Sequence, residues 1–177
     1  LETLYGVDIA YYLRMNFTGF VEVIDALGGV SVYSDREFTV ENIRTYQQGY
    51  NQLTGIEALA FARERMSFPE GDYQRAKNQL EVIRAVVEKA STPAVLGGFS
   101  SLLQAVEGNF ETNLPQDQVL ALASAMGGDW QVETYTASGY SAYRETYSMP
   151  GQELYVILPD QASVEQAAAL LEETMAA

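Results

Sequence analysis

The sequence predicts an α/β domain in which helices pack on a mixed sheet in a layered α-β-α arrangement. Segments with the composition of strands alternate with segments of helical spacing along the whole chain, and this alternation is typical of helices layered on a sheet. The 177 residues are 47% hydrophobic, which is enough to bury one core. No repeat, low-complexity stretch or linker divides the chain, so we expect residues 1–177 to form a single domain.

Composition and capping residues predict the first elements. β-Branched and aromatic residues predict a strand over residues 7–15 that is buried on at least one face. Asn16 or Thr18 then caps a helix, because the apolar residues that follow have helical spacing, and the pair Gly28-Gly29 ends it. A short strand follows over residues 30–33.

The next segment has no clear pattern until a second helix begins. Residues 34–52 are polar and contain turn signals, so we expect an exposed, irregular excursion there. Thr54 and Glu57 have the spacing of a capping box, in which each side chain bonds the backbone of the other residue. A short helix is therefore predicted over residues 55–61.

A loop and a long helix come next. Pro69 and Gly71 predict a loop over residues 66–71, and Asp72 is a good N-cap for a helix over residues 73–90. The helical spacing predicts a core stripe made of Leu80, Ile83, Val87 and Ala90. The rest of the chain predicts a helix over 93–106, a strand over 109–113, a helix over 116–126, a strand over 130–136, a loop or edge strand over 139–150, a strand over 154–158 and a helix over 163–175.

The composition excludes several kinds of chemistry. The chain has no cysteine and no histidine, which excludes disulfides, thiol nucleophiles, Ser-His hydrolases and cysteine-ligated zinc sites. With 24 acidic against 10 basic residues the formal net charge is -14, which argues against binding to nucleic acid. Any chemistry therefore falls to carboxylates, arginines, hydroxyls or a hard metal ion.

Basic residues are concentrated in one part of this acidic chain. Arg63, Arg65, Arg75 and Lys77 lie within fifteen positions of one another, which indicates a local cationic site. The alternative is a solvated face of ion pairs, which is common on helices. The acidic partners for such a face would be Glu64, Glu70, Asp72 and Glu81.

The spacing of three residues favours a site at one helix end. Asp72, Arg75 and Gln79 stand at i, i+3 and i+7, so on a helix they share one side, beginning at its N-terminus. Exposed amides and the helix dipole favour an anion there, and an arginine fork suits phosphate. Arg63 and Arg65 can converge on the same spot, because the connecting loop is short.

Each of these residues also has a plainer interpretation. Asp72 would serve simply as an N-cap, the two arginines before the loop would form a solvated helix end, and Gln79 would be an ordinary surface amide. In the functional interpretation, Asp72 either orients an arginine or helps to hold a divalent cation such as magnesium. The spacing alone therefore predicts only a possible anion site.

Several ordered segments of the chain form a recognisable pattern. They are Phe20 to Val30, Leu53 to Gly55, Ala58 to Arg65, Gly71 to Gln79 and Thr112 to Leu114. The Ala-Arg-x-Arg block followed by Asp-x-x-Arg-x-x-x-Gln is specific. On these segments the chain resembles the LytR-CpsA-Psr family, which attaches anionic or capsular glycopolymers to peptidoglycan in Gram-positive bacteria, and the resemblance covers most of residues 1–160.

The resemblance implies an undecaprenyl-pyrophosphate-linked glycan donor, such as a teichoic acid or capsule precursor. Its lipid would lie in an apolar groove between sheet and helices, and a peptidoglycan hydroxyl would be the acceptor. Arg63, Arg65, Arg75 and Gln79 would bind the pyrophosphate together with Mg²⁺ or Mn²⁺. Asp72 would act beside Arg75 as an arginine orienter, a metal ligand or a base. Stabilisation of a phosphoryl transition state needs neither histidine nor cysteine.

The resemblance also implies a location and leaves alternatives open. The family acts on the outer face of the cytoplasmic membrane, anchored by an N-terminal helix that is not in this chain. Asn78 stands where many relatives carry another arginine, and the family domain begins before Leu1, with a strand, a magnesium-binding aspartate and a further arginine. A polyprenyl-phosphate binding module or regulator without turnover, or a pyrophosphate hydrolase, are therefore the alternative functions.

Overall fold

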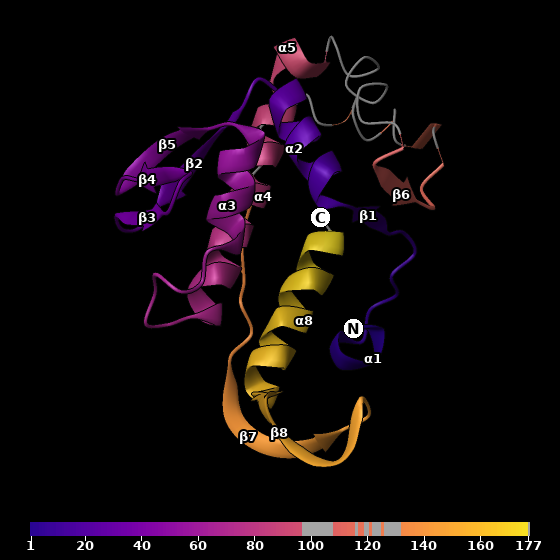
Figure 1. The fold of residues 1–177 in the computed structure, drawn as a ribbon. Coiled ribbons are helices and arrows are strands. Elements are labelled where there is room, and N and C mark those ends of the chain that lie inside the picture. The colour runs from indigo at the N-terminus through magenta and orange to yellow at the C-terminus, as the bar shows by residue number, and fades with distance from the viewer. Residues whose placement is uncertain (97–107, 116, 119–120, 122–124, 126–131, 177) are drawn as a thin grey trace. The chain divides into compact units, whose positions relative to one another are not determined.

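The structure is a computed structural model and describes residues 1–96, 108–115, 117, 118, 121, 125 and 132–176. It confirms the mixed α/β class (Figure 1). The elements in chain order are α1 (Glu2–Tyr5), β1 (Leu13–Met15), α2 (Phe17–Ala26), β2 (Val30–Ser34), β3 (Phe38–Val40), β4 (Arg44–Tyr46), β5 (Gly49–Leu53), α3 (Gly55–Arg63), α4 (Asp72–Ala90), α5 (Pro93–Leu96), β6 (Phe110–Thr112), β7 (Gly139–Thr146), β8 (Met149–Pro159) and α8 (Gln161–Ala176).

The chain divides into two compact units, Tyr11–Glu133 and the combination of Leu1–Ala10 with Thr134–Ala177. In the described part of the chain, the strands pair as antiparallel two-stranded sheets. β1 pairs with β6, β2 with β5, and β3 with β4 in the larger unit, and β7 pairs with β8 in the smaller one.

Helices α2, α3 and α4 organise the larger unit, with α3 packed on both of the others (Figure 1). Asn16 caps α2 through a hydrogen bond that its side chain accepts, as predicted. α2 and α3 approach closely at Gly55, where an added Cβ would lie 2.3 Å from the carbonyl oxygen of Val21. The Gly55 amide also donates to Oδ1 of Asp25 at 2.7 Å. Glycine is required here because any side chain would force the two helices apart.

An aromatic cluster lies at the centre of the core of this unit. The ring of Phe38 stacks on Tyr46 with centroids 4.7 Å apart, and its centroid lies 4.8 Å from that of Phe68 and 5.4 Å from that of Phe61. Aromatic pairs of this kind contribute about 0.5–1.5 kcal/mol each beyond the burial of their area. The cluster therefore joins β3 and β4 to α3 and to the loop that follows it.

The prediction of an exposed, irregular segment over residues 34–52 is wrong. Three short strands, β3, β4 and β5, occupy most of it. Each strand buries only one or two side chains, among them Phe38 in β3, Tyr46 in β4 and Leu53 in β5. The polar residues between them face solvent, so a strand this short leaves little alternation in the sequence.

The expected strand over residues 7–15 is much shorter than predicted. Only Leu13–Met15 forms β1, and residues 7–12 have no regular secondary structure. The expected burial is also wrong, because Tyr11, Tyr12 and Leu13 are about half exposed or more. β1 pairs with β6, which confirms the strand expected over residues 109–113.

The core stripe predicted for the long helix is also wrong. The buried residues of α4 are Gln74, Asn78, Val82 and Ala85, whereas Ile83 is 56% exposed. The two buried amides form a chain, since Nε2 of Gln74 donates to Oδ1 of Asn78 at 3.1 Å and Nδ2 of Asn78 donates to the carbonyl oxygen of Phe61 at 3.3 Å. The apolar stripe of α4 has another role, described below.

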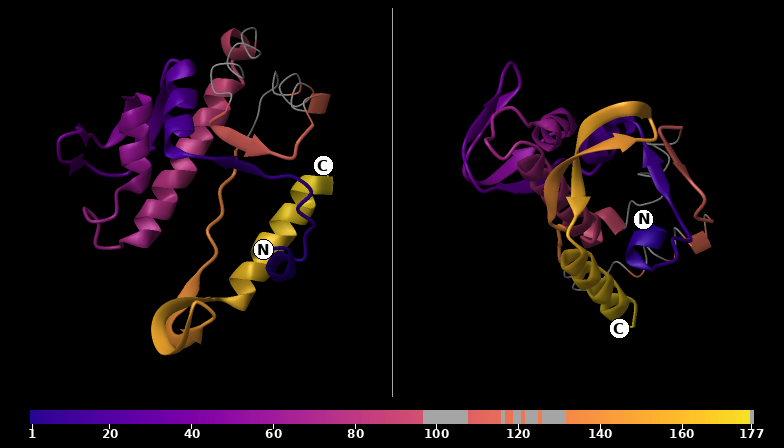
Figure 2. Two further views of the ribbon diagram at one scale, coloured as in Figure 1. Left: turned by 45° about the vertical axis from the view of Figure 1, so that its right-hand side comes forward. Right: turned by 90° about the horizontal axis from the view of Figure 1, so that it is seen from below.

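The smaller unit contains α1, the hairpin of β7 and β8, and α8. β7 and β8 form a long, curved hairpin, and α8 follows it directly (Figure 2). Ser163 in α8 fixes the incoming chain, because its Oγ accepts from the amide of Ser138 at 2.8 Å and lies 2.9 Å from the hydroxyl oxygen of Tyr135. Gly6 ends α1 in the left-handed conformation.

Three remaining predictions fall wholly or partly outside the described residues. α5 confirms the start of the helix expected over 93–106, but residues 97–107 lie outside the described part. Most of the helix expected over 116–126 lies outside it too. Of the strand expected over 130–136, the described residues 132–136 form no strand. The prediction for 139–150 left a loop or an edge strand open, and most of this segment is β7.

Candidate functional site

The candidate site forms where α3 ends and α4 begins. The predicted capping box starts α3, because Oε2 of Glu57 accepts from the amide of Thr54 at 2.9 Å. α3 ends at Arg63, residues 64–71 form a connecting loop, and α4 begins at Asp72. The loop brings Arg65, two residues after the end of α3, into contact with Asp72 at the start of α4.

The prediction that Asp72 is the N-cap of α4 is wrong. Asp72 is the first residue of the helix, and the N-cap is Gly71, with φ 53° and ψ -112°. Residues with a side chain rarely adopt this conformation, so glycine suits the position. Because Asp72 does not cap the helix, its carboxylate is left to contact arginines.

Two arginines converge on one carboxylate oxygen. Oδ1 of Asp72 lies 3.0 Å from Nη2 of Arg75 and 3.4 Å from Nε of Arg65. We call these three residues the Asp72 cluster. All three side chains are between a third and three-fifths exposed, so the cluster faces solvent and adds little to stability. Its two guanidinium groups keep unused donors that can bind an anion.

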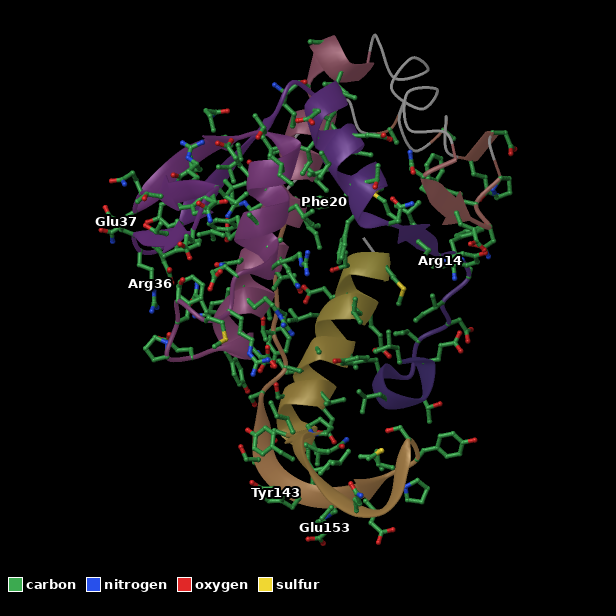
Figure 3. The ribbon with its side chains drawn as sticks, in the orientation of Figure 1. Arg14, Phe20, Arg36, Glu37, Tyr143 and Glu153 are labelled. Carbon is green, nitrogen blue, oxygen red and sulfur yellow. The ribbon has the colours of Figure 1, made fainter. Side chains whose placement is uncertain are left out.

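An apolar cavity of about 470 Å³ lies in the same unit. Its lining comes from β1, α2, α3 and α4, and its apolar side chains include those of Phe17, Phe20, Leu59, Ile83, Val86 and Val87. Figure 3 shows Phe20 on α2, the helix that borders the cavity with α3 and α4. The apolar stripe of α4 predicted as core is thus partly the wall of a cavity.

Two predicted site residues, Arg63 and Gln79, lie on the wall of this cavity. The guanidinium carbon of Arg63 lies 4.6 Å from the centroid of the Phe17 ring, a cation–π contact at the cavity wall. Gln79 stands one helical turn after Arg75 on α4, so the two side chains share a face. The charged cluster and the cavity are therefore neighbours along both helices, and together they suit a ligand with an anionic head and an apolar chain.

The structure thus joins three predicted residues, Arg65, Asp72 and Arg75, by ion pairs and places the other two on the cavity wall. Asn78, the departure from the family pattern, lies elsewhere. Its side chain is 3% exposed and hydrogen-bonded within the core. The amide at this position therefore belongs to the packing of α4 on α3.

Several residues at the site were not predicted from the sequence. One is Phe17, which comes from α2. Another is Arg36, which lies in the turn before β3. Nη1 of Arg36 lies 3.1 Å and 3.2 Å from the two carboxylate oxygens of Glu70 in the connecting loop. The pKa of Glu70 is lowered, first by a backbone hydrogen bond and then by Arg36. Nothing in their local sequence marks these residues, since their partners are more than thirty positions away.

A metal site built from carboxylates needs several of them close together. In the described part of the chain, no group of three or more acidic side chains could hold a metal ion. Asp72 is engaged by two arginines instead. The described residues therefore place Asp72 beside two arginines, and its metal-binding role stays a prediction.

The chain matches the sequence model of the LytR_cpsA_psr family over residues 1–169. It is 40% identical over 119 residues to the polyisoprenyl-teichoic acid–peptidoglycan teichoic acid transferase TagU of Bacillus anthracis, covering 67% of this chain and 39% of that protein. The chain thus spans about two-fifths of the length of this relative.

Solved structures resemble the chain over almost its whole length. The crystal structure of TagV from B. subtilis has a TM-score of 0.79 and 26% identity, covering 97% of this chain and 66% of that one. The Lin1025 protein of Listeria innocua has a TM-score of 0.74 and 29% identity, covering 97% of this chain and 73% of that one. These similarities confirm the fold class predicted from the sequence.

Proposed function

Because the chain belongs to the LytR-CpsA-Psr family, we propose that it takes part in moving a glycopolymer from a polyprenyl-pyrophosphate carrier to peptidoglycan. One observation carries the proposal: an apolar cavity has Arg63 and Gln79 in its wall, next to the arginines of the Asp72 cluster. Its relative TagU is named a teichoic acid transferase, so teichoic acid is the first glycopolymer to test.

The cavity would hold part of the polyprenyl chain. Its wall is almost entirely apolar, and its largest side chains, such as Phe17 and Phe20, come from α2. Burial of apolar area there would supply affinity at roughly 25 cal/mol per Å². A bound lipid would also account for the exposure of Ile83. This isoleucine of α4 is 56% exposed and lines the cavity, so the lipid would cover it.

The pyrophosphate would lie against the arginines at the cavity wall. The acceptor hydroxyl of peptidoglycan attacks the sugar-linked phosphorus, and its oxygen forms the new bond to phosphorus. The bond from that phosphorus to the bridging oxygen breaks, and polyprenyl phosphate leaves with the electron pair. The proton of the acceptor hydroxyl passes through solvent to this leaving phosphate. Arg63, Arg65 and Arg75 would stabilise the charge on the phosphoryl oxygens in the transition state.

Asp72 would orient the two arginines of its cluster. A carboxylate held at 3.0 Å and 3.4 Å from two guanidinium groups fixes the directions of their remaining donors. A magnesium-binding role for Asp72 stays a prediction, and with Mg²⁺ or Mn²⁺ bound the metal would add charge neutralisation at the phosphates. The steps assigned to Arg63, Arg65, Arg75 and Asp72 do not depend on it.

A lipid-linked donor would place this chemistry at a membrane surface, and we propose the outer face of the cytoplasmic membrane of a Gram-positive bacterium. None of the helices in the described part of the chain has the length and hydropathy of a membrane-spanning segment. Anchoring through a further helix of the protein rests on the family resemblance and is part of the proposal.

A binding module without turnover is the second candidate. It is favoured by the engagement of Asp72 with two arginines, because two oriented guanidinium groups are sufficient to bind an anion without any turnover. Such a module would bind polyprenyl pyrophosphate through the same residues. Release of polyprenyl phosphate on addition of peptidoglycan distinguishes the two functions.

The transferase function is tested with the full-length protein, a lipid-linked teichoic acid precursor and peptidoglycan. Arg75→Ala should reduce transfer by roughly 10²-fold, because a donor to the transition-state charge is lost. Arg84→Ala is the matched control, since Arg84 pairs with Glu88 further along the same helix. Transfer that is unchanged in Arg75→Ala would overturn the proposal.

A further inference from the structure

The Asp72 cluster depends on the conformation of the connecting loop, residues 64–71. Arg65 enters the loop and Asp72 follows it, so their contact at 3.4 Å depends on the path of the loop between them. Most of the loop is exposed, and Met66 is 89% exposed. A loop of this kind is mobile unless specific contacts fix it.

One anchor of the loop is apolar. Phe68 is 5% exposed, although its neighbours in the loop face solvent. Its ring packs against that of Phe38 in a T-shaped arrangement, with centroids 4.8 Å apart. This contact fixes the middle of the loop on β3.

The second anchor is Arg36, in the turn between β2 and β3. Its Nη1 lies 3.1 Å and 3.2 Å from the carboxylate oxygens of Glu70, and its guanidinium carbon lies 5.8 Å from the centroid of the Phe68 ring. Arg36 therefore contacts the loop at two points. Figure 3 shows Arg36 beside the loop that joins α3 to α4.

The same turn also holds the start of α4. Oδ1 of Asp35 lies 3.2 Å from Nε of Arg36 and accepts from Nε2 of Gln74 at 3.3 Å. Gln74 lies in the first turn of α4, between Asp72 and Arg75. One turn of the chain thus bonds the end of the loop and the helix start that carries the cluster.

We propose that Arg36 and Glu70 are positioning residues, which hold the connecting loop so that Arg65 meets Asp72 in the geometry that binds a pyrophosphate. The inference rests on the proposed function of the site for its consequence, but not for the contact itself. Neither residue needs to touch the ligand. Their ion pair is 39% and 47% exposed, so removing it should leave the fold intact.

The first experiment measures the loop without any ligand. Amide hydrogen exchange is followed in the full-length protein and in Arg36→Ala, Glu70→Ala and the matched control Arg84→Ala. The amides of Ser67 and Gly71, which donate to Glu64 and Phe68, should lose protection in the first two variants only. Equal protection in all variants would overturn the inference, whatever the site binds.

The second experiment measures the consequence with farnesyl pyrophosphate, and with farnesol as the uncharged control. Arg36→Ala should weaken binding of the pyrophosphate by roughly fivefold to tenfold and leave farnesol unchanged. In an Arg65→Ala background the same change should have almost no further effect, because the residue it positions is gone. Arg36→Lys should restore part of the affinity.

The two failures are distinguishable. Wild-type protein that binds farnesyl pyrophosphate no better than farnesol would contradict the proposed function, and with it the positioning role. A preference for the pyrophosphate that is undiminished in Arg36→Ala, or an Arg36→Ala effect that adds fully to that of Arg65→Ala, would overturn the positioning role alone.

Discussion

Oδ1 of Asp72 lies 3.0 Å from Nη2 of Arg75, which stands three residues later in the first turn of α4. The same oxygen lies 3.4 Å from Arg65, so one carboxylate couples the two ends of the connecting loop. The cluster is solvent-exposed, and this makes it a poor contributor to folding. Its geometry is better explained by the orientation of two guanidinium groups toward an anion.

Asp72→Asn should separate orientation from stability. The amide keeps the shape of the side chain but loses the charge that attracts both arginines, so transfer should fall by about 10²-fold. The free energy of unfolding should change by less than about 1 kcal/mol. Affinity for farnesyl pyrophosphate should weaken too, whereas a residue acting only as a base would leave that affinity unchanged. Transfer assays, urea unfolding and ligand titration supply the three measurements.

Phe17→Leu tests the contact at the cavity wall. In the structure the guanidinium carbon of Arg63 lies 4.6 Å from the centroid of the Phe17 ring. Leucine keeps the wall apolar but removes this ring. Binding of farnesyl pyrophosphate should weaken by roughly twofold to fivefold, which corresponds to about 0.5–1 kcal/mol. Farnesol binding should change little. An equal loss for both ligands would show that the ring contributes only apolar contact.

Gly71→Ala tests the turn into α4. The backbone at φ 53° and ψ -112° is strained for any residue with a Cβ, so the free energy of unfolding should fall by about 1–3 kcal/mol. Gly71→Asn should be no better, because asparagine tolerates the left-handed helical region, where ψ is positive, but not this one. Urea denaturation measures both. A variant as stable as wild type would contradict the conformation described here.

The pH dependence of stability is expected to involve Glu57. Burial raises the pKa of Glu57, but hydrogen bonds from Thr54 and the ion pair with Arg44 outweigh it, so the pKa is lowered. A lowered folded-state pKa means that this stabilisation is complete above the unfolded value of about 4.3 and is lost as the pH falls through the lower folded value.

Glu57→Gln should therefore flatten the loss of stability below about pH 4.3. Urea unfolding at a series of pH values from neutral to acid measures the slope for both proteins. The control is Glu88→Gln, which changes an exposed ion pair of α4. Parallel curves for wild type and Glu57→Gln would contradict the assignment.

The helices were predictable because local residues define them. Asn16 caps α2, and Thr54 with Glu57 starts α3, as the spacing indicates. The strand expected over residues 30–33 is confirmed as β2. β3 and β4 were missed because Phe38 and Tyr46 stack across a short hairpin while most residues around them are polar. A strand that buries a single side chain leaves no periodic signal.

The site was predicted in part for the same reason. The spacing of Arg65, Asp72 and Arg75 is local, and the structure joins them. Helical periodicity could not show whether Ile83 lies in a core or lines a cavity, because both positions select apolar residues. Phe17 and Arg36 reach the site through tertiary contacts, which a single sequence does not encode in any local pattern.

The proposed pyrophosphate site is tested most directly by the affinities of the full-length protein for farnesyl pyrophosphate and farnesol. The arginines beside the cavity predict a preference for the pyrophosphate of at least tenfold, since charge-assisted hydrogen bonds contribute roughly 1.5–3 kcal/mol each. Arg75→Ala should reduce that preference by about tenfold without changing farnesol binding. Equal affinity for the two ligands in the wild-type protein would contradict the claim that this site binds a polyprenyl pyrophosphate.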